Sequence, residues 1–471
     1  PVLELAHTHI GQCRSSMHMV GHSRRTGPAK EPHVITATTP MLAVRSVSRG
    51  PRARWRQYTQ TRPYANQYLT WALVRVWAAL AGLELFPYPS GHALFDDVDL
   101  YDRWAHQILQ GNFPIFDVRW QYPPLAALVF VASYLLSPHR IGFVLVALSA
   151  DYGILRLLDR KARTTTTRLP VYVWIATPLI MGPIVLGRYD VFPTLFAVAA
   201  LVTAGGWASG AMWALGGMLK VWPAVGLLSV KRGSHLKTAI SFTATVVVGM
   251  YLVLQWWPTG MSFLRHERDR GIQVESVAAL PFMIWNAGPG TTSSNYQWGS
   301  LEILHINSAA IGVAMTIAVV LLLGIIALWH VQGRLERIPA PDIVLIVVLI
   351  SMVTSRVLSP QYNLWLMGIV AVCGFRPQPQ YLRILLLIGL SSFAAQLLFP
   401  FMYSSFRFGG LVATTVHALR IYWLVLATVL CWQGMVARLI PPSMPRWRLR
   451  EELAPSDELP ARMSASVETS I

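Results

Sequence analysis

The amino-acid sequence predicts an all-α, polytopic integral membrane protein. Hydrophobic residues make up 54% of the 471 residues and charged residues only 13%, whereas a soluble protein carries roughly a quarter charged residues. Apolar runs close to the length of a bilayer-spanning helix recur from Trp71 to Trp432. The 31 prolines and 18 tryptophans suit broken membrane helices and interfacial aromatic belts.

The two ends of the chain differ from this apolar middle. Residues 1–62 are basic and have no apolar core, so we expect a disordered cytoplasmic tail there. Residues 441–471 mix charged residues with Pro and Ser, and we expect a second disordered cytoplasmic tail. Residues 63–440 then form one transmembrane domain. The net charge of +17 fits the positive-inside rule and anionic lipid better than nucleic acid.

Basic segments set the expected topology, because cytoplasmic loops carry Lys and Arg. We place both termini and the segments 159–168, 231–237, 330–337 and 376–383 inside. The loop 87–122 then lies outside, residues 123–136 form a helix at the outer surface, and residues 209–230 make a tight hairpin with its apex near Lys220–Pro223. With the hairpin counted twice, the chain crosses a plasma membrane about twelve times. The other expected spans are about 69–86, 141–158, 170–186, 191–205, 238–257, 308–329, 342–358, 363–375, 382–399 and 411–432.

The outer loop gathers carboxylates. It holds five of the chain's 22 acidic residues, among them Asp97 and Asp99 in the run DVDLY. Residues two apart on an extended or turning segment point the same way, so one carboxylate could accept a proton while the other tunes its pKa. The alternative is a solvated acidic loop in which an Asp caps a helix at Leu100–Leu109. The residue types alone favour neither interpretation.

Two further outer segments combine basic and acidic side chains. In GRYD, Arg188 could hold a phosphate, or it could pair with Asp190 and extend to the membrane surface. Lys220 interrupts an apolar hairpin, where an ammonium group needs an anionic partner such as a lipid-linked phosphate. The competing role for Lys220 is to bind the free carbonyls of a broken helix.

The loop 258–307 and the segment after residue 355 supply the remaining polar candidates. Arg270, Gln273 and Glu275 suit a hydroxyl-rich or phosphate ligand, although an exposed charged loop has the same composition. Arg356 precedes SPQY and is a second candidate phosphate contact. The three cysteines have no metal-binding spacing, and no nucleotide-binding or zinc-protease motif occurs. We therefore expect no cofactor and no metal ligand set; the clustered Asp residues permit a divalent metal without demanding one.

The order of these motifs resembles glycosyltransferase family 87. The matching segments are DVDLY, GNFP, YPPLA, GRYD, LKVWP, RGIQVES and SPQYNLW, within about residues 69–432. The resemblance implies a GT-C fold and inverting transfer of mannose from a polyprenyl-phosphate-mannose to a lipid or glycan acceptor at the outer face. It also implies a catalytic Asp in an Asp-x-x-x-Tyr segment, which matches Asp97–Tyr101, with Asp99 as its competitor. The remaining motif residues expected at the substrate are Tyr122, Gln361 and Tyr362.

A transporter or flippase of a lipid-linked sugar is the competing class. It would also have about twelve spans and basic residues within the membrane. We favour the transferase because the carboxylates gather in one outer loop instead of at mid-membrane. A donor carrying another sugar, such as arabinose or glucose, would need the same architecture.

Overall fold

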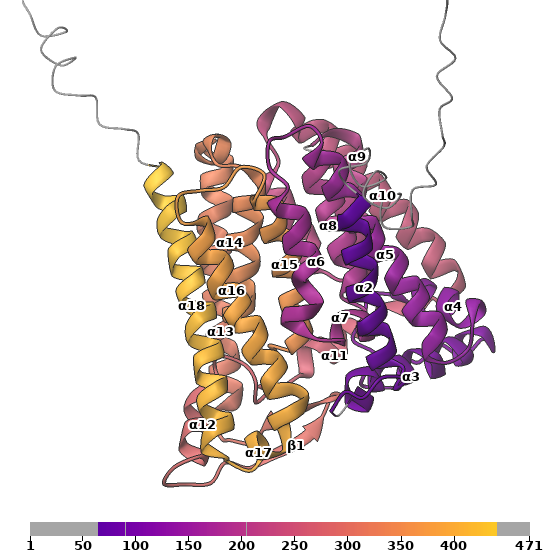
Figure 1. Cartoon of the computed structure of the whole chain (residues 1–471), viewed down its shortest axis with the longest axis vertical. Coiled ribbons are helices and arrows are strands. Elements are labelled where there is room, and N and C mark those ends of the chain that lie inside the picture. Colours follow the sequence, from indigo (N-terminus) through magenta and orange to yellow (C-terminus); the bar gives the residue numbers. More distant parts are fainter. Residues whose placement is uncertain (1–64, 90, 204, 440–471) are drawn as a thin grey trace, which may run out of the picture. The chain divides into compact units, whose positions relative to one another are not determined.

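The computed structural model describes residues 65–89, 91–203 and 205–439, without the side chains of residues 65, 91, 92, 268 and 269. The two tails expected at 1–62 and 441–471 lie outside these residues. The described chain is mostly helical, as predicted (Figure 1). Its first half contains α2 (Ala65–Gly82), α3 (Gly91–Leu109), α4 (Ala126–Leu136), α5 (Arg140–Ala162), α6 (Leu169–Met181), α7 (Ile184–Gly187), α8 (Val191–Thr203), α9 (Gly206–Leu219), the 3-10 helices η1 (Trp222–Ser229) and η2 (Arg232–Ser234), and α10 (His235–Trp256).

The second half begins with short elements and returns to long helices. A two-stranded antiparallel sheet pairs β1 (Ser294–Gln297) with β2 (Ser300–Ile303), and Gln297 lies opposite Ser300. This hairpin is an exception to the all-α prediction. The other elements are η3 (Gly260–Ser262), α11 (Phe263–Asp269), α12 (Leu280–Asn286), α13 (Ser308–Val331), η4 (Arg334–Arg337), α14 (Ala340–Val353), η5 (Pro360–Tyr362), α15 (Asn363–Cys373), α16 (Tyr381–Gln396), the π-helical η6 (Leu397–Met402), α17 (Tyr403–Arg407) and α18 (Leu411–Leu439).

Five segments of the described chain are long and apolar enough to cross a membrane. They are Arg140–Ala162, Arg232–Trp256, Ser308–Val331, Tyr381–Arg407 and Leu411–Leu439. Shorter apolar helices occupy most of the other expected spans, and the expected hairpin at 209–230 is formed by α9 followed by η1. The multi-helix membrane architecture is thus present, while the number of about twelve crossings stays a prediction.

Polar contacts between distant segments show that helices run in alternating directions. Gln67 near the start of α2 donates a hydrogen bond of 2.7 Å to Asp159 near the end of α5. Arg168, which lies between α5 and α6, donates a hydrogen bond to the side-chain oxygen of the same glutamine. The first turn of α2 and the last turn of α18 therefore lie at one end, whereas α3, α12, α17 and β1 lie at the other (Figure 1).

The expected conformation of the acidic segment is wrong. We expected an extended stretch before a helix at Leu100–Leu109, but α3 begins at Gly91 and contains both Asp97 and Asp99. Leu94, Val98 and Tyr101 follow a helical spacing and are buried, so tertiary packing holds the helix despite its many Asp residues. Side chains two apart on a helix point in different directions. Asp97 and Asp99 therefore do not form the neighbouring pair that we expected.

Candidate active site

Asp97 lies on α3 against the arginine of GRYD. One carboxylate oxygen of Asp97 is 2.8 Å from Nη1 of Arg188. The Asp97 side chain is 37% exposed, whereas that of Arg188 is 7% exposed. The ion pair therefore orients a carboxylate that solvent or a ligand can still reach, while the arginine is enclosed by protein.

A glycine permits this close approach. Gly187 ends α7, and a Cβ atom there would lie 2.7 Å from the carbonyl oxygen of Leu94 and 2.9 Å from the Phe95 ring. Only a residue without a side chain lets α3 pack so closely on α7. The glycine in GRYD thereby brings Arg188 beside Asp97.

Asp99 has a different partner. Its two carboxylate oxygens accept hydrogen bonds of 2.9 and 2.8 Å from Arg140 at the start of α5. Arg140 also binds Glu84, at 2.7 Å. Asp102 accepts a hydrogen bond from the backbone N–H of His139, next to Arg140. Asp99 and Asp102 thus join α3 to the beginning of α5, which is a structural role.

Asp117, the last acidic residue of the segment, pairs locally. Arg119 donates two hydrogen bonds to its carboxylate, and the indole of Trp104 donates a third at 3.0 Å. Burial alone would raise the pKa of Asp117, but the hydrogen bonds from Arg119 lower it. The acidic side chains of this region are therefore held by separate partners.

The buried Tyr101 and Tyr189 and the partly buried Tyr122 form a wall behind Asp97. The hydroxyl groups of Tyr101 and Tyr122 are 3.0 Å apart, and the Tyr122 ring lies edge-on to that of Tyr189. The Tyr101 ring stacks on Phe130 with a centroid distance of 4.3 Å. Burial raises the pKa of Tyr101 and of Tyr122 well above the usual value, so both hydroxyls stay protonated. They can donate hydrogen bonds but are poor bases.

Lys220 stands where α9 ends and the chain turns into η1. Its Nζ is 2.7 Å from a carboxylate oxygen of Asp190, and the indole N–H of Trp365 donates to the same oxygen at 2.7 Å. The ammonium group also lies 4.7 Å from the centroid of the Tyr362 ring. Tyr362 stacks on Trp365 at 4.2 Å. A cation is thus held among aromatic faces, which attract it through their quadrupoles.

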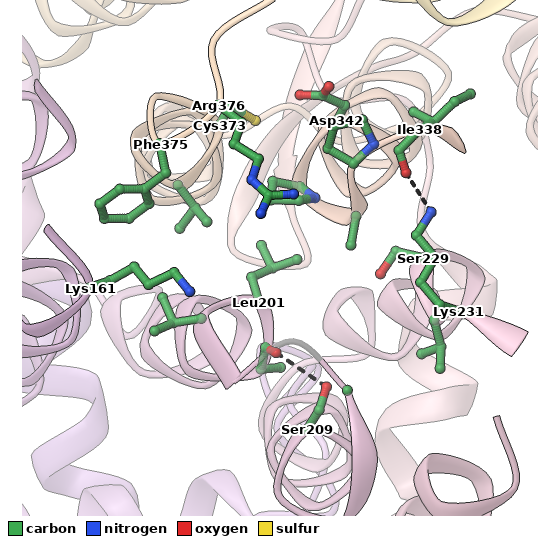
Figure 2. A pocket seen from close by; sticks show the side chains of 18 of the residues that line it. Lys161, Leu201, Ser209, Ser229, Lys231, Ile338, Asp342, Cys373, Phe375 and Arg376 are labelled. Atoms are coloured by element: carbon green, nitrogen blue, oxygen red, sulfur yellow. Dashed lines mark hydrogen bonds between the residues drawn. The ribbon is translucent and has the colours of Figure 1, made fainter. Parts of the chain in front are cut away.

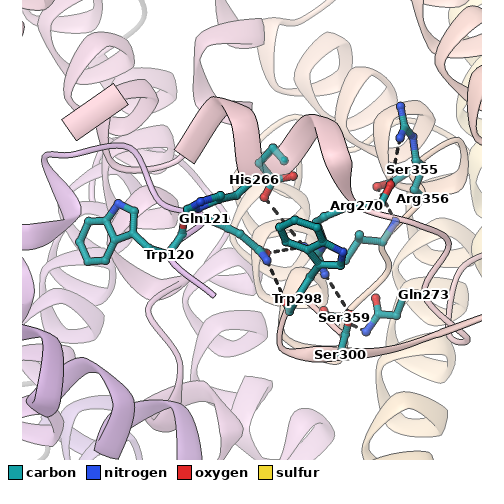
Figure 3. Close-up of polar contacts among 12 residues, drawn as sticks. Trp120, Gln121, His266, Arg270, Gln273, Trp298, Ser300, Ser355, Arg356 and Ser359 are labelled. Atoms are coloured by element: carbon teal, nitrogen blue, oxygen red, sulfur yellow. Dashed lines mark hydrogen bonds and ion pairs between the residues drawn. The ribbon is translucent and has the colours of Figure 1, made fainter. Parts of the chain in front are cut away.

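The segment RGIQVES contacts the first outer loop, the hairpin and the chain before η5 (Figure 3). Arg270 donates to the side chains of Gln121 at 2.6 Å and Ser300 at 3.1 Å. Arg356 donates to the backbone carbonyl of Arg270 at 3.1 Å. The backbone N–H of Gln273 in turn donates to the carbonyl of Arg356 at 3.0 Å. The loop is therefore fixed against both the first outer loop and the chain before η5.

Glu275 is the buried acid of this loop. It accepts a hydrogen bond of 2.6 Å from the Gln273 side chain, and one of its oxygens is 3.9 Å from Nη1 of Arg420 on α18. Its side chain is 3% exposed, and the oxygen that faces Arg420 accepts no hydrogen bond. Burial raises the pKa of Glu275 to about 7, although Arg420 opposes the shift.

The β-hairpin borders an open cavity near Asp97. The cavity measures about 480 Å³ and is lined by Val118, Arg119 and the turn from Tyr296 to Gly299. Gln121 donates a hydrogen bond of 2.8 Å to the backbone carbonyl of Trp298, which ties the hairpin to the first outer loop. Burial raises the pKa of the Tyr296 hydroxyl, and the negative charge of Asp97 raises it further. The Tyr296 ring therefore lies within electrostatic reach of the Asp97 carboxylate.

The structure brings most of the expected site residues into one network of contacts. Asp97 pairs with Arg188, and Asp190, two residues after Arg188, pairs with Lys220. Lys220 lies over the ring of Tyr362, the neighbour of Gln361. Asp99 lies apart on the α5 side. The predicted catalytic and binding roles stay predictions. The members that join the network are Asp97, Tyr101, Tyr122, Arg188, Asp190, Lys220, Arg270, Gln273, Glu275, Arg356, Gln361 and Tyr362.

Several functional candidates were missed by the sequence analysis. Trp365 follows Tyr362 at the i+3 position of a helix, a spacing that could have revealed it. The β-hairpin turns at Trp298 and Gly299, whose φ values are 53° and 78°. A glycine between two short segments that alternate polar and apolar residues was the sequence signal that could have predicted this hairpin. Nothing in the sequence of α18 singles out Arg420 as the partner of Glu275.

Comparison with known proteins agrees with this geometry. The sequence profile of glycosyltransferase family 87 matches residues 120–297. This part of the chain is therefore similar to that family. The matched region includes Arg188, Lys220 and Arg270 of the network, while Asp97 precedes it. The similarity indicates a glycosyltransferase.

Two relatives align with a longer part of the chain. A polyprenol-phosphate-mannose-dependent alpha-(1-2)-phosphatidylinositol pentamannoside mannosyltransferase of Mycolicibacterium smegmatis is 25% identical over 302 residues, which cover 61% of this chain and 68% of that protein. The protein of the same name from Mycobacterium tuberculosis is 25% identical over 303 residues, covering 61% and 65%. The chain thus spans about two thirds of the length of these relatives.

Proposed function

We propose that the protein transfers a mannosyl unit from polyprenyl-phosphate-mannose to a hydroxyl group of a mannosylated lipid, forming an alpha-1,2 linkage with inversion. The observation that carries this proposal is the network itself, in which a reachable carboxylate, Asp97, lies within the same set of contacts as four basic side chains. The names of the two relatives supply the donor and the acceptor class.

The basic side chains fit a lipid-linked phosphate leaving group. Nε of Arg188 and Nε of Arg270 are buried and donate no hydrogen bond within the described residues, although Nε of Arg270 faces a carboxylate oxygen of Glu302 at 3.8 Å. Buried donors without a hydrogen bond are costly unless a ligand satisfies them. Together with Lys220 and Arg356 they can hold a phosphate and stabilise the negative charge that develops on it as the glycosidic bond breaks. Arg188 would then contact both the base and the leaving group.

Asp97 is the proposed general base. In an inverting transfer, the acceptor oxygen forms a bond to the anomeric carbon from the face opposite the phosphate, and the bond from that carbon to the phosphate oxygen breaks. The acceptor proton passes to the Asp97 carboxylate, and the polyprenyl phosphate leaves with the electron pair. The ion pair with Arg188 fixes the orientation of the carboxylate during this step.

The open cavity beside the hairpin suits the acceptor. Tyr296 is 64% exposed on its rim, and ligand sites combine such aromatic faces with a few polar groups. Arg119 from the first outer loop and Gln297 from the hairpin supply those polar groups. We assign this cavity to the acceptor sugar and the Lys220 side of the network to the donor.

The proposed membrane topology places the network at the outer face. The basic segments 159–168, 231–237 and 330–337 share one end of the helical assembly, because Lys161, Lys231 and Arg337 line one cavity. The network lies with α3 and β1 at the other end. Alternation of helix directions supports about twelve crossings of the plasma membrane. The residues placed in these roles require no cofactor and no nucleic acid.

A transfer assay with purified full-length protein tests the proposed function. Liposomes would contain polyprenyl-phosphate-[14C]mannose and a phosphatidylinositol mannoside acceptor, with the glucose-bearing donor in parallel reactions. We expect radiolabel in the acceptor only with the mannose donor. Consumption of the glucose donor alone would contradict the sugar assignment. Movement of donor across the bilayer without any transfer would contradict the enzymatic function and favour a transporter.

A further inference from the structure

We propose that a second site, at the end of the membrane domain opposite the candidate active site, binds the headgroup of an anionic phospholipid. The site is a cavity of about 460 Å³ between the ends of α5, α8, η4 and α15 (Figure 2). It is independent of the proposed glycosyl transfer, and it needs only that the helical domain is embedded in a bilayer.

The charge of the cavity is the first observation. Its lining contains four basic side chains, Lys161, Lys231, Arg337 and Arg376, against two acidic ones. Both acids are already engaged. Asp342 is 2.9 Å from Arg438, and Glu336 accepts a hydrogen bond from the backbone N–H of Arg232. The cavity therefore has an excess of positive charge that its own acids do not neutralise.

The second observation is that three of these cations have no partner in the described part of the chain. Lys231 donates to the backbone carbonyls of Leu335 and Ile338, so it closes the wall of the cavity. The side chains of Lys161, Arg337 and Arg376 form no hydrogen bond or ion pair with any described residue. Figure 2 shows the charged ends of Lys161 and Arg376 directed toward the open space. Converging, unpaired cations fit a phosphate group.

The remaining lining indicates the source of that phosphate. Leu201, Trp213 and Phe375 give the cavity an apolar part beside its cationic part. A soluble phosphate compound would gain nothing from this surface, whereas the glycerol and first acyl carbons of a lipid would bury apolar area there. Basic pockets between membrane helices on the cytoplasmic side are suited to anionic headgroups. We therefore assign the site to a phospholipid such as phosphatidylglycerol.

The test is thermal unfolding of the full chain in nanodiscs of defined composition. Replacing phosphatidylcholine with 30% phosphatidylglycerol should raise the melting temperature by roughly 2–4 °C. The double variant Lys161→Gln/Arg376→Gln should lose this rise, and Arg337→Gln should reduce it. Arg383→Gln is the matched control, because Arg383 is exposed on α16 near the same end and is likewise unpaired among the described residues. It should keep the full rise.

Three results would overturn the lipid site. The first is an equal melting temperature in both lipids. The second is an equal loss of the rise in the control variant, which would indicate general surface charge. The third is protection by 10 mM inorganic phosphate in phosphatidylcholine nanodiscs that matches the effect of phosphatidylglycerol, which would identify a site for a soluble phosphate. Mannosyl transfer by the double variant in phosphatidylcholine should equal that of the unchanged protein, so failure here leaves the active-site assignment standing.

Discussion

At the scale of the residue, the decisive feature is that Arg188 and Lys220 already have anionic partners, Asp97 and Asp190. Lys220 binds Asp190 and lies over the Tyr362 ring. A phosphate that binds there joins a preformed arrangement and does not have to order a mobile side chain. Preorganised charge of this kind stabilises a leaving group without reorganisation during the reaction.

Lys220→Gln should therefore weaken use of the donor. Loss of a charge-assisted hydrogen bond to phosphate is expected to lower kcat/KM for polyprenyl-phosphate-mannose by about 10- to 100-fold, mainly through KM. Lys237→Gln, an exposed change on α10, is the control. Steady-state kinetics against donor concentration gives the comparison. Equal values for the two variants would remove Lys220 from the donor site.

Glu275 is expected to make the stability of the folded protein depend on pH. Its pKa is raised by burial from 4.5 to about 7, so its contribution to stability is fully present below about pH 4.5 and is lost as the pH rises through 7. The melting temperature of Glu275→Gln minus that of the unchanged protein should increase between pH 5 and pH 8. Glu267→Gln, at a more exposed side chain, should show no such trend. A pH-independent difference for Glu275→Gln would show that this carboxylate does not titrate in that interval.

At the scale of the element, the sequence predicted the helices well and the outer segments poorly. Expected spans such as 308–329 and 411–432 correspond closely to α13 and α18, because continuous apolar runs are the strongest sequence signal. The acidic run was expected as an extended or turning segment, or as a loop that caps a helix at Leu100–Leu109. The buried helical spacing of Leu94, Val98 and Tyr101 instead keeps it within α3, although Asp is a weak helix former. Hence the location of the Asp97 segment was predictable, but the separation of Asp97 from Asp99 was not.

Contacts in the site between segments that are far apart in the sequence could not be predicted from the sequence. Arg420 and Glu275 are 145 positions apart, and no local pattern connects them. The hairpin reaches Gln121 across a similar distance in sequence. Such pairings depend on how the helices pack, which the hydrophobic pattern of each helix does not specify.

The hairpin gives a prediction at this scale. Tyr296→Ala removes an aromatic face from the proposed acceptor cavity, so kcat/KM for the acceptor should fall by roughly 10-fold with KM for the donor unchanged. Tyr251→Ala is a matched control, since Tyr251 on α10 is 63% exposed and Tyr296 is 64% exposed. Varying each substrate separately measures both constants. An effect on donor KM alone would assign the cavity to the donor.

At the scale of the whole molecule, the two ends of the helical domain have different chemistry. One end holds the carboxylates, tyrosines and the hairpin, and the other holds the unpaired cations of the second cavity. This asymmetry is the basis for placing the active site outside and the basic end inside.

Cysteine labelling tests that orientation. Asn112 is exposed after α3, and Gly233 lies at the basic end with open space around its Cα. In a Cys13→Ser background, a membrane-impermeant maleimide should label Asn112→Cys in intact cells and Gly233→Cys only in inverted vesicles. The described native cysteines, Cys373 and Cys431, are buried. The reverse pattern would invert the topology.

The central claim is that Asp97 is the general base and that Asp99 is structural. The measurement is single-turnover transfer of [14C]mannose by the Asp97→Asn and Asp99→Asn variants, with melting temperatures recorded for both. Asp97→Asn should keep its fold and lose at least about 100-fold in rate, because the amide cannot accept the proton. Asp99→Asn should lower the melting temperature by weakening the contact with Arg140, while the rate per folded molecule stays within a few-fold. A slow Asp99→Asn beside an Asp97→Asn of near-normal rate would contradict the assignment.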